Sequence, residues 1–182
     1  MRFDIAGATF EYVGGDITDQ PGIDAVVNAA NAQLMPGGGV AGAIHRAAGP
    51  ELARACQPLA PIQPGQAVIT DAFKLPNKHV IHCLGPVFGV DEPADELLAS
   101  CYRETLRLAD QHSLRSIAFP AISTGAFGYP LQQAADVATR TLAAQVGAFQ
   151  HIQLVRFVLW DATALQAHID AAQTVLKGSG HQ

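Results

Sequence analysis

Two glycine-rich segments carry the residue types that could bring backbone N–H groups against an anion. Residues 35–42 contain three consecutive glycines, and residues 123–130 contain Gly125 and Gly128. Glycine has no Cβ and adopts positive φ, so a ligand can approach the chain closely there. Each segment lies between a predicted strand and a run of helix formers. Because the free N–H groups of a helix N-terminus favour phosphate, the two segments together predict a grip on two phosphates.

The strength of this interpretation comes from the two segments occurring together. Residues 37–42 have the GxGxxG spacing by letter, but that pattern alone is weak evidence, and we do not expect a Rossmann site. Neither segment matches GxxxxGK[ST], so the P-loop type of nucleotide site is excluded. A run of three glycines by itself is more often a flexible turn, and a single strand–glycine–helix turn is weak evidence. Placement of both segments after predicted strands favours a phosphate site.

The composition is that of one globular domain without a basic face. The chain has 182 residues, 49% of them hydrophobic and 15% charged, and a formal net charge of −5. A general nucleic-acid binder usually clusters its Lys and Arg, whereas the 11 here are spread thinly, so no nucleic-acid partner is expected. A phosphate-bearing ligand must then be held by backbone dipoles, and neither a metal ion nor an organic cofactor is expected.

Cysteine use and hydropathy lead us to expect a cytoplasmic protein. Cys56, Cys83 and Cys101 lie far apart, with no CxxC and no zinc-like Cys/His spacing, which is typical of reduced intracellular thiols. We expect no signal peptide from the first residues, and no membrane span, since no apolar run reaches ~18 residues.

Alternating strand and helix patterns predict a layered α/β domain. The polarity pattern of residues 3–13 indicates an antiparallel pair or an edge strand. Further strands are predicted at 24–29, 66–72, 79–84, 116–121 and 152–160, and helices at 41–55, 93–113, 131–146 and 161–176. We expect one domain over residues 1–177, a flexible tail over 178–182, and ligands beyond the carboxyl ends of the strands.

Five short motifs in order resemble the macro domain family, most closely its MacroD-type branch. They are GDIT at 15–18, VNAAN at 27–31, GGGV at 37–40, IHRAAGP at 44–50 and ISTG at 122–125. The resemblance covers roughly residues 3–176 and implies a three-layer α/β/α sandwich around a mixed, mostly parallel sheet. It implies binding of ADP-ribose or an ADP-ribosylated protein. It also implies hydrolysis of ADP-ribosyl linkages on acidic side chains, or deacetylation of O-acetyl-ADP-ribose, with a non-catalytic reader as the alternative.

The resemblance assigns the adenine end of the ligand to three residues. Asp16 matches the carboxylate that accepts a hydrogen bond from the adenine amine, and Ile17 matches a residue that lines the adenine pocket. Trp160 matches an aromatic residue that packs on adenine, a contact worth ~1–3 kcal/mol per base. Without the resemblance, Asp16 could equally be a turn residue or N-cap before Thr18, and Trp160 a core or rim residue.

The resemblance assigns the rest of the ligand to the two glycine loops and to their neighbours. Asn31 matches the residue beside the distal ribose and the bond that is cleaved, and Asn28 matches a structural partner. His45 matches a residue that organises the site and could also transfer a proton. The resemblance thus implies catalytic positions at Asn31, His45 and Ala41, the last being the position that usually holds Asp. Phe127 would cover the distal ribose or fill its own loop. The matched diphosphate and ribose residues are Gly37, Gly38, Gly39, Val40, Ser123, Thr124, Gly125, Ala126 and Phe127.

Two positions depart from the MacroD-type pattern. Ala41 stands where that branch has an Asp, four residues before His45, and Pro36 replaces a glycine. The carboxylate that would orient water is therefore missing. The chain could be a binder or very slow enzyme, a hydrolase in which the substrate phosphate positions water, or an engineered inactive variant. His82 lies outside these motifs, and we predict that it is a satisfied core histidine.

Overall fold

The computed structural model describes residues 1–179 and is built around one seven-stranded sheet of order β1-β2-β7-β6-β3-β5-β4. The strands are β1 (Arg2–Ile5), β2 (Ala8–Gly14), β3 (Ala25–Ala29), β4 (Ala67–Asp71), β5 (His79–Cys83), β6 (Ser116–Phe119) and β7 (Leu154–Leu159). The five inner strands run parallel, and the edge strands β1 and β4 are antiparallel to their neighbours. The predicted mixed, mostly parallel sheet is confirmed.

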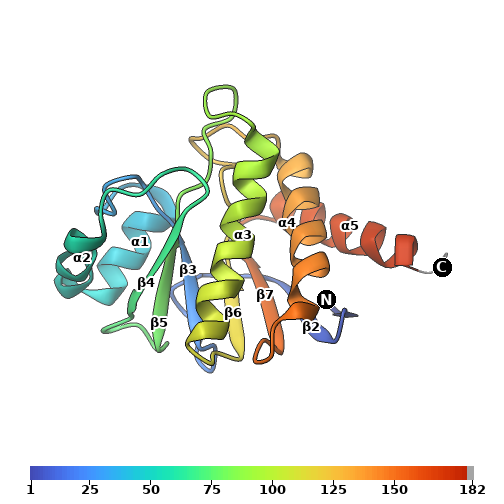
Figure 1. The fold of residues 1–182 in the computed structure, drawn as a ribbon, viewed down its shortest axis with the longest axis horizontal. Helices are drawn as coiled ribbons and strands as arrows, with labels where there is room; N and C mark the ends of the chain where they lie inside the picture. The colour runs from blue at the N-terminus through green and yellow to red at the C-terminus, as the bar shows by residue number, and fades with distance from the viewer. Residues whose placement is uncertain (180–182) are drawn as a thin grey trace.

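Helices cover both faces of this sheet (Figure 1). The helices are α1 (Gly39–Ala48), α2 (Pro50–Cys56), α3 (Ala94–Gln111), α4 (Leu131–Gln145) and α5 (Ala162–Ser179), with 3-10 turns η1 (Gln57–Leu59) and η2 (Val146–Ala148). Alternate strand residues feed two cores, because successive side chains on a strand point to opposite faces. Val26 and Val80 pack with Ile44 of α1, while Val27 and Ile81 belong to the core under α3, α4 and α5. The three-layer α/β/α prediction is therefore confirmed.

The predicted element boundaries needed three changes. The helix predicted at 41–55 is two helices, because Gly49 takes a φ of 91° and Pro50 then starts α2. The first segment is the predicted antiparallel pair, but β2 lies inside the sheet between β1 and β7. Residues 178–179, assigned to the tail, continue α5, and the remainder of that tail lies outside the described residues.

The sheet topology creates a crevice at one edge. From β3 the chain moves outward to β4 and β5, then crosses by α3 to β6 on the other side of β3. Connections leave in opposite directions at such a switch point, so the carboxyl ends of the parallel strands border an open groove. The loops after β2, β3, β5, β6 and β7 all start at this edge.

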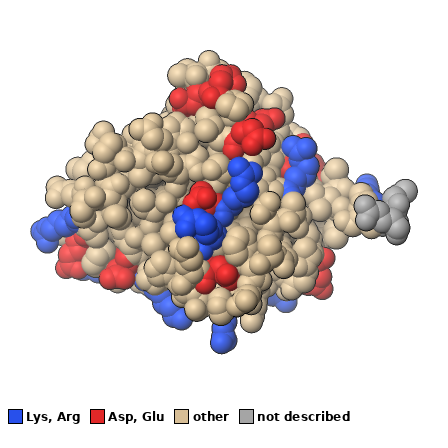
Figure 2. Space-filling model, viewed as in Figure 1, with Lys and Arg blue, Asp and Glu red and all other residues tan. Residues whose placement is uncertain are grey.

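Charged side chains are dispersed on the face of the molecule that Figure 2 draws. Lys and Arg lie interspersed with Asp and Glu there, without a basic stripe. Over residues 1–179, no helix is both long and apolar enough to cross a membrane.

A buried polar chain ties β3 to β5 and β4. His82 is fully buried; Asn28 Nδ2 donates to its Nδ1 at 3.0 Å, so its Nε2–H is the one that faces Thr70 Oγ1, also at 3.0 Å. Thr70 Oγ1 in turn donates to the Asp71 carbonyl oxygen at 3.0 Å. The prediction that His82 is a satisfied core histidine is confirmed, and this network requires the neutral ring.

Acidification should destabilise the fold through His82. Burial lowers its pKa from 6.5 to about 3, with a smaller contribution from nearby His45. The unfolded chain therefore binds the proton first, and the stabilisation present above pH ~6.5 is lost as pH falls toward ~3, by up to about 1.4 kcal/mol per pH unit. Urea unfolding followed by circular dichroism between pH 7.5 and 5 would measure this slope.

The matched variant is His82→Gln, which keeps an amide donor and acceptor but does not titrate. We expect a shallower pH dependence in this variant, whatever its absolute stability. A residual slope should remain, because burial also lowers the pKa values of His45 and His168. Equal slopes in the two proteins would contradict the assignment.

Candidate functional site

A cleft of about 860 Å³ lies at the carboxyl edge of the parallel strands. All but two of the predicted site residues line it: Asp16, Ile17, Asn31, Gly37, Gly38, Gly39, Val40, Ala41, Ser123, Thr124, Gly125, Ala126, Phe127 and Trp160. The tertiary structure thus brings together segments that are up to 144 positions apart in the chain, as between Asp16 and Trp160. The exceptions are Asn28 and His45.

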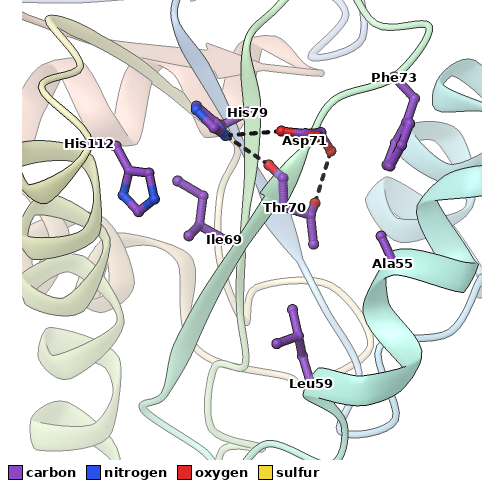
Figure 3. A pocket seen from close by; sticks show the side chains of 8 residues that line it. All are labelled: Ala55, Leu59, Ile69, Thr70, Asp71, Phe73, His79 and His112. Atoms are coloured by element: carbon purple, nitrogen blue, oxygen red, sulfur yellow. Dashed lines mark hydrogen bonds and ion pairs between the residues drawn. The ribbon is translucent and has the colours of Figure 1, made fainter.

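A second hollow, of about 270 Å³, lies beside the edge strand β4 (Figure 3). Its two imidazoles are tied to the backbone, since His79 Nδ1 bonds the Thr70 carbonyl at 3.1 Å and His112 Nδ1 bonds the Leu108 carbonyl at 2.9 Å. None of the predicted site residues lines it. We therefore place the candidate site in the larger cleft.

The first glycine loop turns directly into α1 and leaves donors free. Gly38 is the N-cap with extended backbone, Gly39 has a φ of 55°, and the first helical bond is from Gly42 N to Gly38 O at 3.2 Å. The N–H groups of Gly39, Val40 and Ala41 therefore have no hydrogen-bond acceptor within the helix. No acidic residue lies in the first turn of α1, so nothing competes for its positive end.

The same loop is held in place from both sides. A Cβ on Gly42 would overlap the Gly37 carbonyl oxygen, so α1 and the loop pack at a distance that only glycine allows. Asn31 Nδ2 donates to the Met35 carbonyl at 2.8 Å, and Met35 N donates to Asn31 Oδ1 at 3.0 Å. Asn31 therefore shapes the loop in addition to lining the cleft.

The second loop carries strain and an unsatisfied hydroxyl. Ser123 has a φ of 66°, and its buried Oγ has no hydrogen-bond partner among the described residues. Backbone strain in a non-glycine residue is typical of functional sites. A Cβ on Gly85 would overlap Ser123 Oγ, so this glycine after β5 allows the loop to sit there. The hydroxyl is thus held at the cleft with its hydrogen-bonding capacity unused.

Asp16 and Trp160 lie together at the opposite end of the cleft because β2 and β7 pair in parallel. Asp16 Oδ1 accepts bonds from Thr18 N at 2.9 Å and Thr18 Oγ1 at 2.7 Å, and these bonds lower the pKa of Asp16. The predicted turn is confirmed, since one oxygen of Asp16 closes it. The residue also lines the cleft, and its contact with adenine stays a prediction. Trp160 is 85% exposed, so the core interpretation of this residue is wrong.

The cleft residues follow the order of the strands. Asp16 and Trp160 follow β2 and β7, Ser123 follows β6, and Asn31 and Gly85 follow β3 and β5. With strands ~4.8 Å apart, five strands extend over roughly 19 Å. The cleft is thus long enough for a ligand with an aromatic group at one end, anionic groups in the middle and a polar group at the other end.

His45 and Asn28 lie beneath the cleft. His45 is buried, both of its ring nitrogens lack partners among the described residues, and burial lowers its pKa. Its ring lies 6.5 Å from that of His82, the ring that Asn28 holds. Neither residue lines the cleft, which corrects their predicted place in it.

Sequence reasoning missed several lining residues. These are Gly15, Ala29, Ala30, Ala43, Arg46, Gly85, Pro120, Ala121, Ile122, Val158, Leu159, Asp161 and Ala164. Gly85 had a signal, since it directly follows the predicted strand at 79–84. Most of the others sit where strands end, and only the pairing of the strands shows which side chains face the cleft.

Comparison with known proteins agrees with the fold. The macro domain family model matches residues 27–138. This chain belongs to the macro domain family. The family prediction is therefore confirmed.

Two relatives and one solved structure show how similar this chain is to other members of the family. It is 53% identical over 156 residues to a Salmonella gallinarum O-acetyl-ADP-ribose deacetylase, covering 83% of this chain and 87% of that protein. It is 49% identical over 158 residues to a Streptomyces griseus macro domain-containing protein, covering 84% and 88%. A glycine-to-valine variant of the Oceanobacillus iheyensis macrodomain, solved with ADPR, has a TM-score of 0.92 at 38% identity and covers 97% of this chain and 98% of that one.

The packing at Gly42 predicts that a glycine-to-alanine substitution in a helix will lower the free energy of unfolding, which is the opposite of the usual effect. Gly-to-Ala inside a helix ordinarily stabilises by about 1 kcal/mol. In Gly42→Ala the added methyl meets the Gly37 carbonyl, so we expect a net loss of about 1–3 kcal/mol in the free energy of unfolding. Denaturant unfolding would measure it.

The matched control is Gly38→Ala in the same loop. Gly38 has a negative φ, and its added Cβ would meet nothing within 4 Å. Its free energy of unfolding should change by less than about 0.5 kcal/mol. Equal or increased stability of Gly42→Ala would show that the loop does not depend on this contact.

Proposed function

We propose that this macro domain binds ADP-ribose in the long cleft. The observation that carries the proposal is the order of chemical groups across the sheet. Trp160 and Asp16 follow β7 and β2 at one end, Ser123 Oγ follows β6, and Asn31 follows β3 together with the loop that leads to the free N–H groups of α1. Adenine, diphosphate and distal ribose follow one another in ADP-ribose in that order. The name of the Salmonella relative and the ADPR in the Oceanobacillus structure support the same ligand.

Backbone groups hold the diphosphate in this proposal. Oriented N–H groups at a helix N-terminus neutralise phosphate without a Lys/Arg cluster. The free amides of Gly39, Val40 and Ala41 meet one phosphate, and the 123–128 loop meets the other. This arrangement accounts for a phosphate site in a chain of net charge −5.

We propose further that the protein is a hydrolase of ADP-ribosyl esters on acidic side chains or of O-acetyl-ADP-ribose. Water held between Asn31 and the α-phosphate attacks the ester or the distal ribose. The products are ADP-ribose and a carboxylate, and the released proton goes to solvent. His45 lies beneath the cleft, so its role is to hold α1 in place.

A second candidate function, a reader of ADP-ribose without turnover, rests on Ala41. Ala41 lines the cleft with a methyl group, and the only carboxylates among the described lining residues are Asp16 and Asp161, at the adenine end. No lining carboxylate is therefore placed beside Asn31 to accept a proton from water. Both candidates share the ligand, and in both cases we propose a cytoplasmic location, supported by three free, buried cysteines.

Replacing Asp16 by Asn tests the adenine contact without breaking the turn. An amide keeps the Oδ1 that accepts from Thr18, but places an N–H where the carboxylate would accept from the adenine amine. We expect the dissociation constant for ADP-ribose to rise about tenfold by calorimetry. Asp19→Asn, an exposed change three residues away and outside the cleft, is the control. Unchanged affinity in Asp16→Asn would remove the adenine contact from the proposal.

Replacing Ala41 by Asp separates the two candidate functions. A carboxylate at the start of α1 could serve as a general base, a role worth ~10²–10⁴-fold in rate. We expect Ala41→Asp to release acetate from O-acetyl-ADP-ribose faster by a factor in that range. Ala41→Asn has nearly the same size without the basic group and should show no such gain.

The turnover of the unmodified protein completes this test. Slow release that exceeds the uncatalysed rate supports a hydrolase, whereas ADP-ribose binding with no release supports the reader. Absence of ADP-ribose binding would exclude both.

A further inference from the structure

Arg46 is the one cation among the described residues that line the cleft. It is exposed, in the last turn of α1. A basic residue there usually interacts with the negative end of the helix dipole or with a neighbouring carboxylate. Neither interaction is seen here: within residues 1–179 no hydrogen bond or ion pair occupies the guanidinium, and its side chain runs the other way.

The side chain of Arg46 runs back toward the start of α1. A Cβ on Gly42 would lie 3.0 Å from Arg46 Nη1 and would also overlap the Gly37 carbonyl oxygen. A Cβ on Gly37 would in turn lie 3.3 Å from Asn31 Nδ2. These contacts place the guanidinium at the Asn31 end of the cleft, remote from Asp16 and Trp160.

Arg46 leans toward the helix N-terminus, as long helical side chains usually do. This direction carries its guanidinium away from the negative end of α1, which would otherwise stabilise a cation. Glycine at position 42 leaves the room that the guanidinium uses. An unpaired guanidinium held in that position is suited to an anion or carbonyl supplied by a ligand, because its planar donors match a carboxyl group.

We propose that Arg46 binds the carboxyl-derived group joined to the distal ribose, and so distinguishes ADP-ribosylated acidic side chains from free ADP-ribose. This inference rests on the proposed function, which places the distal ribose at the Asn31 end. Backbone N–H groups already serve the phosphates, and the ester carbonyl is the next polar group beyond that ribose. Hydrolysis converts the acyl group of the ester into a carboxylate, so the group facing Arg46 gains a negative charge.

The test compares two ligands on the full protein. One is free ADP-ribose, and the other is a glutamate peptide whose link to ADP-ribose is an amide in place of the ester, so that it does not hydrolyse. We expect the unmodified protein to bind the peptide about tenfold more tightly than ADP-ribose. Arg46→Ala should lose that difference while keeping its affinity for ADP-ribose within twofold, and Arg46→Lys should keep part of it.

Controls separate this inference from a general charge effect. Arg54→Ala removes an equally exposed arginine on α2, outside the cleft, and should leave both affinities unchanged.

Each failure has its own signature. If the unmodified protein does not bind ADP-ribose, the proposed function fails. If the unmodified protein binds both ligands with equal affinity, Arg46 does not bind the group joined to the distal ribose, and the inference is wrong. If Arg46→Ala weakens both ligands by the same factor, the guanidinium contacts ADP-ribose itself and the inference is overturned.

Discussion

The cleft depends on two places where the absence of a side chain lets backbone segments touch. Gly42 allows α1 to pack on the Gly37 carbonyl, and Gly85 allows the loop after β5 to pack on Ser123. The first contact fixes the free amides of α1, and the second holds the Ser123 hydroxyl at the cleft. A methyl group at either place would move a phosphate-binding element. The site is thus built from close backbone approach more than from reactive side chains.

This construction explains how an acidic protein can hold a diphosphate. Amide dipoles carry no net charge and cost no desolvation of a buried ion, so they can face phosphate inside an apolar surrounding. Backbone hydrogen bonds close the second loop on itself, as in the bond from Tyr129 N to Ser123 O at 2.9 Å. Arg46 is the exception, and it lies at the mouth, where solvent lowers the cost of a free charge.

The buried layer under the cleft has a different role from its lining. His82, Asn28 and Thr70 join three strands by hydrogen bonds in the interior, and His45 lies above His82 on α1. These groups keep β3 and β5 in register at the point where Asn31 and Gly85 emerge. Because the network needs a neutral histidine, acid should disturb the strands that position the cleft, although no histidine of this layer lines it.

The sequence by itself determined the fold class, both glycine loops and the family. The periodicity of strands and helices, and motifs such as VNAAN and GGGV, are local patterns. They can be recognised without knowing which residues touch one another. The resemblance of these motifs to the macro domain family also pointed to Asp16, Asn31 and Trp160 as site residues.

Only the tertiary structure decided which groups share the cleft and what their neighbours do. The pairing of β2 with β7 brings Asp16 close to Trp160. The motif around His45 led us to place this residue in the cleft, but the structure buries it below the cleft. The break at Gly49 and the direction of Arg46 likewise depend on packing. Such facts are set by contacts between residues far apart in the chain, and a local pattern carries no record of them.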